Sequence, residues 1–248
     1  MGKSNGRRRK RRRRGILGKL VSFVVILIAV LVGATVFFRA SVIEVSGGSH
    51  YTEEELVEAS GVETGDRLLF VNESKIRNSI KSRLPYVSDV SVSVQLPSTM
   101  KITIEENSVV AYISSDGENW GIDKNCKLLG TLEGNELGGI AQISGLTLDS
   151  PKEGGEISSE NSSAVVYLEE LIGLLADKDM MENVTAVDLT DLFNVTLNYL
   201  SRFTVKLGEN EELAYKVVLL QGVMDEMDDN DSGTINVSNG ESAVYSEE

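Results

Sequence analysis

The feature that most limits how this chain folds is an uncharged apolar segment near its N-terminus, Leu20–Phe38, with the sequence LVSFVVILIAVLVGATVFF. As an α-helix at about 1.5 Å per residue, the segment measures roughly 28 Å, close to the hydrocarbon thickness of a bilayer. A cleaved signal peptide is the alternative, but its apolar part usually covers about 7 to 15 residues and ends in an A-x-A-like site. This segment is longer and is followed by Arg39. We therefore expect one uncleaved membrane-spanning helix over residues 20–38.

Basic residues concentrated before this segment predict its orientation. Residues 1–38 contain ten Lys or Arg and no Asp or Glu. Because Lys and Arg are retained on the cytoplasmic side, we expect a cytoplasmic tail over residues 1–19 and export of residues 40–248. The basic residues expected to fix this topology and to face anionic lipid are Arg7, Arg8, Arg9, Lys10, Arg11, Arg12, Arg13, Arg14 and Lys19.

The same basic run is also compatible with a nucleic-acid-binding patch. The rest of the chain carries 14 basic and 38 acidic residues, a net charge of −24, and such a charge disfavours binding to a phosphate backbone. A topology signal beside a membrane span explains the run more simply, so we expect no nucleic-acid partner.

Catalytic and metal chemistry have little support in the sequence. Cys126 is the only cysteine and His50 the only histidine, whereas a nucleophile needs an adjacent base and zinc usually needs four N or S ligands. A pair of hydrolase carboxylates stays open by number alone, since there are 38 Asp and Glu, but no pair is distinguished by its sequence context. We expect no enzymatic activity and no cofactor.

The exported part divides into two sections, and the first begins with a strand and a short helix. Val42–Gly48 predicts the strand. Thr52 with Glu55 three residues later forms a capping box that starts a helix, and Gly61 ends it.

A second helix and a hairpin follow. Asn72 caps the helix and Pro85 stops it. Two runs of alternating apolar and polar residues then predict a pair of strands joined by a turn, so the order of the section is β-α-α-β-β. The apolar positions expected to face the core are Ile76, Ile80, Leu84, Val90, Val92, Val94, Leu96, Met100, Ile102 and Ile104.

The second section, from about Val109, predicts a mixed α+β domain. Short apolar runs and a Gly-rich meander precede two helical patterns, Asn161–Asp177 and Glu211–Met227, with the alternating runs AVDL, NVTLNYL and FTVKL between them. The runs have the length of strands, so we expect a sheet combined with two helices. Met224 and Met227 continue the apolar stripe of the second helix and are expected in the core.

The last apolar pattern is Gly233–Tyr245, with the sequence GTINVSNGESAVY. Ile235 and Val237 are expected to face the core as one strand, and Asn239-Gly240 is a hairpin signal. Glu241–Tyr245 is then expected to fold back as an edge strand, with a single bulged strand as the alternative.

The acidic run before this pattern partly matches a calcium-binding loop. Asp228, Asn230, Ser232 and Gly233 occupy the expected early positions, but Asn239 stands where the loop needs a bidentate Glu. No helical pattern follows, so an acidic turn is favoured over a calcium site.

A set of short pieces, in one order along nearly the whole chain, carries a family resemblance. The pieces are Val42–Gly47, Gly65–Val71, Pro85-Tyr86-Val87, Leu96-Pro97, Glu105-Glu106, the box Trp120–Asp123, Val205–Gly208 with Lys216, and Ile235-Asn236-Val237. This ordered set resembles the FtsQ/DivIB division proteins of bacteria. Two positions depart from the family pattern: Glu106-Asn107 stands for its Glu-Arg, and Asn236 stands for its Asp.

The resemblance implies an α+β architecture in which a POTRA domain, here residues 40–108, precedes a β domain over residues 109–245 and a short tail over 246–248. It also implies a non-enzymatic divisome scaffold that binds FtsL-type and DivIC/FtsB-type bitopic proteins and supports the septal peptidoglycan synthase complex. The partner is implied to add a strand to an exposed sheet edge near the C-terminus. We assign this contact, as a hypothesis, to Ile235, Val237, Ser238, Glu241, Ser242, Ala243, Val244 and Tyr245.

An alternative function is an exported receptor, or a translocation or chaperone module, that uses a POTRA domain to bind peptides. Translocation proteins usually carry POTRA domains in tandem or before a barrel, and the sequence contains no second β-α-α-β-β pattern. Under the scaffold hypothesis, we expect the chain in the cell membrane as a single-pass type II protein at the division septum.

Overall fold

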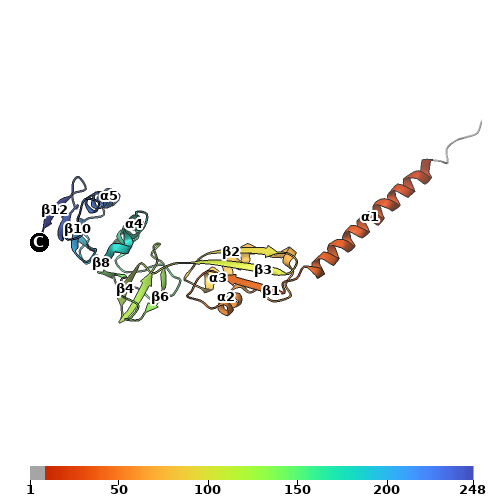
Figure 1. The fold of residues 1–248 in the computed structure, drawn as a ribbon, viewed down its shortest axis with the longest axis horizontal. Coiled ribbons are helices and arrows are strands. Elements are labelled where there is room, and N and C mark those ends of the chain that lie inside the picture. The colour runs from red at the N-terminus through yellow and green to blue at the C-terminus, as the bar shows by residue number, and fades with distance from the viewer. Residues whose placement is uncertain (1–8, 248) are drawn as a thin grey trace, which may run out of the picture. The chain divides into compact units, whose positions relative to one another are not determined.

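The computed structural model describes the backbone of residues 9–247 and the side chains of residues 18–247 (Figure 1). Within them, one compact unit comprises residues up to Ile80 together with Asp89–Glu105, and the second comprises Lys81–Ser88 together with the residues from Glu106 onward. Of the basic residues assigned to topology, Arg7 and Arg8 lie outside the described residues. The side chains of residues 9–14 lie outside them too, while Lys19 is described and exposed.

The first element is a long apolar helix, α1 (Arg9–Phe37). Its segment Gly18–Phe37 is long and apolar enough to cross a membrane by length and composition. The helix ends one residue before the expected end at Phe38, although the Phe38 N–H still donates to the Ala34 carbonyl at 2.9 Å.

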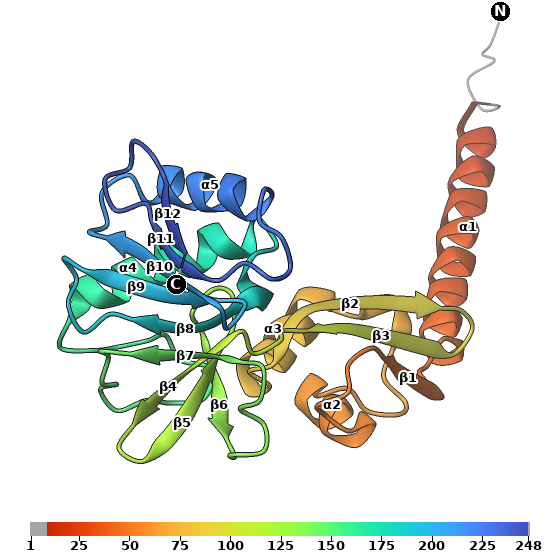
Figure 2. The ribbon, with the colours of Figure 1, turned by 60° about the vertical axis from the view of Figure 1, so that its left-hand side comes forward.

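The β-α-α-β-β order predicted for the first section after the apolar segment is confirmed. The elements are β1 (Val42–Ser46), α2 (Glu53–Ser60), the 3-10 turn η1 (Leu68–Phe70), α3 (Glu73–Arg83), β2 (Val87–Gln95) and β3 (Thr99–Glu106). The three strands form a sheet in the order β1-β3-β2, in which β1 runs parallel to β3 (Figure 2). β1 is therefore an edge strand of this sheet, with β3 as its neighbour.

The local signals that set these elements act as predicted. The Thr52 hydroxyl accepts from the Glu55 N–H at 3.3 Å, and the Glu55 carboxylate accepts from the Thr52 N–H at 2.8 Å, completing the capping box. Gly61 ends α2 in the left-handed region at φ 66°, where an L side chain would be strained. The Asn72 side chain accepts from the Lys75 N–H at 3.0 Å.

Most of the predicted apolar positions of this section are buried, from Ile76 to Ile104. Leu96 is an exception, because it is 55% exposed. β2 ends at Gln95, so Leu96 begins the turn and no longer follows the alternation of the strand. Leu84 and Val94 are only half-buried.

The second section forms a nine-stranded sheet in the order β12-β11-β10-β9-β8-β7-β4-β5-β6. The helices α4 (Ser162–Ala176) and α5 (Leu213–Met224) and the 3-10 turn η2 (Met181–Asn183) complete it. The strands are β4 (Ala111–Ser115), β5 (Glu118–Ile122), β6 (Leu128–Leu132), β7 (Ala141–Ser144), β8 (Val184–Asp188), β9 (Val195–Tyr199), β10 (Phe203–Gly208), β11 (Gly233–Asn236) and β12 (Val244–Glu247).

The topology places both helices on one face of this sheet. α4 connects the parallel strands β7 and β8, and α5 connects the parallel strands β10 and β11. β8 and β10 each run antiparallel to β9, so the two crossovers start in the same strand direction and step toward the same edge. Since such crossovers are right-handed, both helices lie on the same side, as Figure 2 shows.

One face of the C-terminal half of the sheet is therefore covered and the other is open. Inward positions such as Val205 and Ile235 are fully buried, and Met224 and Met227 pack against this core as predicted. The alternate positions are mostly exposed or half-buried and polar, among them Thr196, Asn198, Thr204, Lys206, Thr234 and Asn236.

Candidate partner-binding edge

β12 is the terminal strand of the nine-stranded sheet, with β11 as its one neighbour among the described residues. β11 and β12 are antiparallel, with Asn236 opposite Val244, Ile235 opposite Tyr245, and Thr234 opposite Ser246. The predicted hairpin is thus confirmed and the single bulged strand is not. The exposed edge predicted near the C-terminus is the outer side of β12.

The hydrogen bonds of β11 determine which groups of β12 point outward. The Gly233 N–H donates to the Arg202 carbonyl at 3.1 Å, and the Val237 N–H donates to the Lys206 carbonyl at 3.0 Å. Residues 233, 235 and 237 therefore direct their N–H and C=O groups toward β10, so Thr234 and Asn236 direct theirs toward β12. Their opposite residues, Ser246 and Val244, bond inward, and the N–H and C=O groups of Tyr245 and Glu247 point to the free edge.

The side chains of β12 alternate between the two faces of the sheet. Tyr245 lies on the covered face, where its hydroxyl donates to the Ser232 carbonyl at 3.0 Å and its ring meets Phe203 edge-on at a centroid distance of 6.4 Å. Desolvation, with added effect from the carboxylates of Asp231 and Glu247, raises the pKa of Tyr245. Val244 lies on the open face and is 56% exposed.

The turn of the hairpin is longer than the sequence suggests. The strand predicted at Glu241–Tyr245 begins at Val244, and Glu241, Ser242 and Ala243 lie in the turn. The Asn239 side chain accepts from the N–H groups of Glu241 and Ser242 at 3.2 and 3.3 Å, and Gly240 has φ 67°. This cap occupies the backbone groups that strand pairing would have used, so the predicted start of the strand is wrong.

The other residues assigned to the contact lie at different depths. Ile235 and Val237 are fully buried in the core, so their side chains do not face the solvent. Ser238 is exposed next to the turn, and its N–H donates to the Asn236 side chain at 3.0 Å. The Asn that replaces the family's Asp thus still accepts this local bond.

The Arg202 side chain binds the backbone of the acidic run before β11, a contact that the sequence pattern did not indicate. One Arg202 guanidinium nitrogen donates to the carbonyls of Asp228 and Asp231, each at 2.7 Å, and the guanidinium lies 4.8 Å from the centre of the Phe203 ring. The Asp228 N–H also donates to the Asp231 carboxylate at 2.7 Å. The described residues contain no group of three or more His, Cys, Asp or Glu that could hold a metal.

Two of the family pieces make contacts behind the edge. The Gly208 carbonyl accepts from the buried Tyr167 hydroxyl at 2.9 Å, and desolvation raises the pKa of this tyrosine. Lys216 is buried, its ammonium donates to the Glu209 carbonyl at 2.7 Å, and desolvation lowers its pKa. Both contacts fix the β10–α5 connection, and a lone Lys in an apolar helical stripe was the sequence signal for the second.

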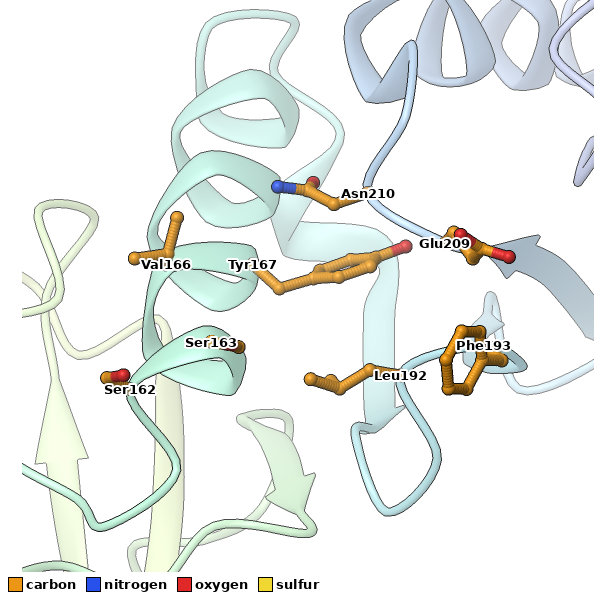
Figure 3. A pocket seen from close by; sticks show the side chains of 8 residues that line it. All are labelled: Ser162, Ser163, Val166, Tyr167, Leu192, Phe193, Glu209 and Asn210. Atoms are coloured by element: carbon orange, nitrogen blue, oxygen red, sulfur yellow. The ribbon is translucent and has the colours of Figure 1, made fainter.

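A separate hollow of about 400 Å³ opens between the start of α4 and the β8–β9 loop. Figure 3 shows Val166 and Tyr167 on α4, with Leu192 and Phe193 on the loop across from them. Among the eight lining residues, Glu209 is the one ionisable group besides Tyr167. The lining combines apolar side chains with these two ionisable groups, and the Tyr167 hydroxyl already donates to the Gly208 carbonyl.

Comparison with known proteins agrees with this architecture. Residues 38–107 match the family model described as POTRA domain, FtsQ-type. The chain is 28% identical over 217 residues to the cell division protein DivIB of Clostridium acetobutylicum, covering 85% of this chain and 83% of that protein. It is 25% identical over 224 residues to DivIB of Clostridium tetani, covering 87% and 83% respectively.

A further relative carries the other family name. The cell division protein FtsQ of Corynebacterium glutamicum is 26% identical over 213 residues, which cover 84% of this chain and 90% of that protein. The chain is thus similar over most of its length to the FtsQ and DivIB cell-division proteins of bacteria, and its residues 38–107 match the FtsQ-type POTRA domain.

Proposed function

We propose that the chain is a non-enzymatic, membrane-anchored scaffold of the divisome that binds FtsL-type and DivIC/FtsB-type bitopic proteins and so supports septal peptidoglycan synthesis. The observation that carries the proposal is the outer side of β12, a terminal strand with a defined set of outward backbone groups. An extended partner segment forms a new strand there, as in other cases of strand addition to a sheet edge.

The proposed placement in the cell supports this use of the edge. The apolar segment Gly18–Phe37 would anchor the chain, and the basic residues before it would keep the N-terminus in the cytoplasm. The edge strand would then face the exported side, together with the exported parts of bitopic partners at the septum.

The proposal of a non-enzymatic role is supported by the one cysteine and the one histidine of the chain, which a Cys–His nucleophile would require. Cys126 is buried, and desolvation with the nearby Glu169 and Asp123 carboxylates raises the pKa of its thiol to about 12. His50 belongs to the first unit, where its ring packs edge-on against Tyr51 at 4.9 Å, while Cys126 belongs to the second. A thiol of this kind stays protonated near neutral pH and is a poor nucleophile.

The proposal is tested with Val244→Asp in the full chain, by co-purification with tagged FtsL-type and DivIC-type partners. Val244 lies on the open face, so the new charge leaves the core intact but lies beside any added strand. Asn198→Asp is the matched control, because Asn198 lies on the same face of β9, three strands further into the sheet. We expect loss of partner recovery for Val244→Asp and normal recovery for the control.

Removal of the residues from Gly233 onward tests the same edge with a larger change and is also expected to abolish recovery while leaving membrane insertion intact. Tyr245→Asp is less informative, because it also removes the contacts of the ring with Phe203 and Ser232. Normal recovery of the partners by the shortened chain would show that β12 is not the binding edge. A fluorescent fusion that fails to form a mid-cell band in dividing cells would contradict the scaffold function itself.

A further inference from the structure

Backbone hydrogen bonds join the residues directly after α1 to the segment 65–68 of the first unit. The Leu68 N–H donates to the Phe38 carbonyl at 3.1 Å, the Ala40 N–H to the Asp66 carbonyl at 2.8 Å, and the Gly65 N–H to the Ala40 carbonyl at 2.8 Å. Arg39 and Arg67 form an antiparallel bridge. The segment 65–70 thus lies beside the first residues after the apolar helix.

The turn between β2 and β3 is bonded to the same stretch. The Ser98 carbonyl accepts from the N–H groups of Ser41 and Val42 at 2.8 and 3.2 Å. We call residues 38–42, 65–70 and 96–98 together the membrane-proximal end of the first unit.

Exposed large apolar side chains gather at this end. Among residues 39–107, all of which the structure describes, the large hydrophobic residues with exposed side chains are Val42 (47%), Leu69 (45%), Phe70 (70%) and Leu96 (55%). All four belong to the membrane-proximal end. Single exposed apolar residues are normal on a protein surface, but their restriction to one end indicates that this end faces an apolar phase.

The distances are short enough for this end to reach lipid. Arg39 follows Phe38 directly, at about 3.8 Å between Cα atoms, and the bridge places Arg67 about 5 Å from Arg39. The polar layer on each side of the hydrocarbon core is roughly 5 to 8 Å thick. If the span ends near Phe38, the segment 65–70 therefore lies at the depth of the headgroups.

Cations accompany the apolar side chains. The side chains of Arg39 and Arg67 are exposed, and a hollow of about 470 Å³ beside Phe70 is lined in part by Arg67 and Lys75. The neighbouring Asp66 carboxylate accepts from the Glu63 N–H at 3.0 Å. A surface with apolar side chains next to Arg and Lys is typical of segments that lie at a lipid interface.

We propose that the membrane-proximal end is a lipid-binding surface, in which Leu69, Phe70 and Leu96 enter the outer boundary of the hydrocarbon layer and Arg39 and Arg67 contact phospholipid phosphates. The proposal rests on the membrane placement of α1 given above. It makes the bilayer a second attachment point for the POTRA domain, which limits how the exported part tilts about the end of the span.

The test is lipid quenching of a tryptophan at position 70 in the full chain, reconstituted in vesicles of phosphatidylcholine and phosphatidylglycerol with brominated acyl chains. Phe70→Trp adds one indole to the native Trp120, whose buried side chain gives a background measured with the native chain. The control is Glu105→Trp, an exposed position near the far end of β3, roughly 23 Å from Ser98 at about 3.3 Å per residue. We expect blue-shifted added emission that is mostly lost in brominated vesicles for Phe70→Trp, and water-like, unquenched emission for Glu105→Trp.

Each other outcome is decisive. Extraction of the native chain by alkaline carbonate would overturn the placement of the span and this proposal with it. An integrated chain in which position 70 is quenched no more than position 105 would overturn this proposal alone, and blue-shifted but unquenched emission would show that protein covers the surface instead. Leu96→Trp repeats the test if Phe70→Trp fails to fold. Phosphatidylglycerol should increase the quenching at position 70 over that in phosphatidylcholine alone, and Arg67→Gln should reduce this increase. Absence of the increase in the chain with native Arg67 would overturn the phosphate contact.

Discussion

Glu247→Pro tests the backbone geometry of the proposed binding edge. In the hydrogen-bond pattern derived above, the N–H of Glu247 points to the free edge, whereas the N–H of Ser246 points to β11. Proline is tolerated in an edge strand where its missing N–H faces outward, but it breaks the ladder where that N–H faces a neighbour. Glu247→Pro should therefore leave the free protein intact, and Ser246→Pro should loosen β12.

The size of the effect follows from one backbone hydrogen bond. A net contribution of about 0.5 to 1.5 kcal/mol corresponds to a loss of partner affinity of roughly 2- to 13-fold. Glu247→Ala distinguishes the effect of losing the charge from that of losing the N–H, because it removes the carboxylate and keeps the backbone donor. We expect Glu247→Ala to bind nearly as well as the native chain at moderate salt, because exposed charges contribute little.

The assay is calorimetric titration of the full chain in detergent with the exported segment of a DivIC-type partner, alongside thermal unfolding of each variant. Glu247→Pro should lose affinity at an unchanged unfolding temperature, and Ser246→Pro should lose both. Equal affinity of Glu247→Pro and Glu247→Ala would refute pairing of a partner strand along β12. A fall in the unfolding temperature for Glu247→Pro would instead refute the assignment of outward and inward groups.

Three further predictions concern stability and reactivity. Thr52→Ala should lower the stability of the first unit by about 1 kcal/mol by thermal unfolding, because it removes the N-cap. Hydrogen bonds from the backbone and side chain of Thr52 lower the pKa of Glu55. The ionised Glu55 therefore stabilises the fold above about pH 4.3, and this contribution is lost as the pH falls through the lowered pKa. The loss on acidification should be smaller in Thr52→Ala. Cys126, with a pKa of about 12, should react with iodoacetamide at pH 8 at the rate of unfolding, and fast labelling of the folded chain would contradict its burial. We also propose that residues 40–108 fold alone as the POTRA domain, and a fragment without a cooperative thermal transition would count against those bounds.

The first section after the apolar segment was predictable because its signals are local. Thr52, Gly61 and Asn72 each fix a helix end through bonds within a few residues, and the alternation of β3 puts Met100 and Ile102 on one face whatever the rest of the chain does. The parallel pairing of β1 with β3 depends on contacts between residues about 57 apart, such as the Ser46 and Thr103 hydroxyls at 3.2 Å, and no local pattern encodes it.

The sequence predicted the C-terminal hairpin correctly but not the residue at which its second strand begins. Asn239-Gly240 correctly indicated a reversal of the chain, but a two-residue turn would have paired Val237 with Ser242 directly. The Asn239 side chain binds the N–H groups of Glu241 and Ser242 in the turn, so pairing resumes only at Val244. The role of Arg202 could not be predicted from the sequence, because its acceptors at Asp228 and Asp231 are backbone carbonyls, which every residue has.

The position of β12 is fixed by this chain's own contacts, which matters for the proposed binding of a partner strand. Gly233 has φ 147°, and a Cβ there would collide with the Ser246 carbonyl, so β11 and β12 fit closely only because this residue is glycine. The Tyr245 hydroxyl bond to Ser232 holds the same strand from the covered face. Ordering a strand costs roughly 1 to 2 kcal/mol per residue in backbone entropy. In the proposed complex that cost falls on the incoming segment alone, because β12 is already ordered. Substitutions of Gly233 or Tyr245 that loosen β12 should therefore weaken binding without removing any partner contact.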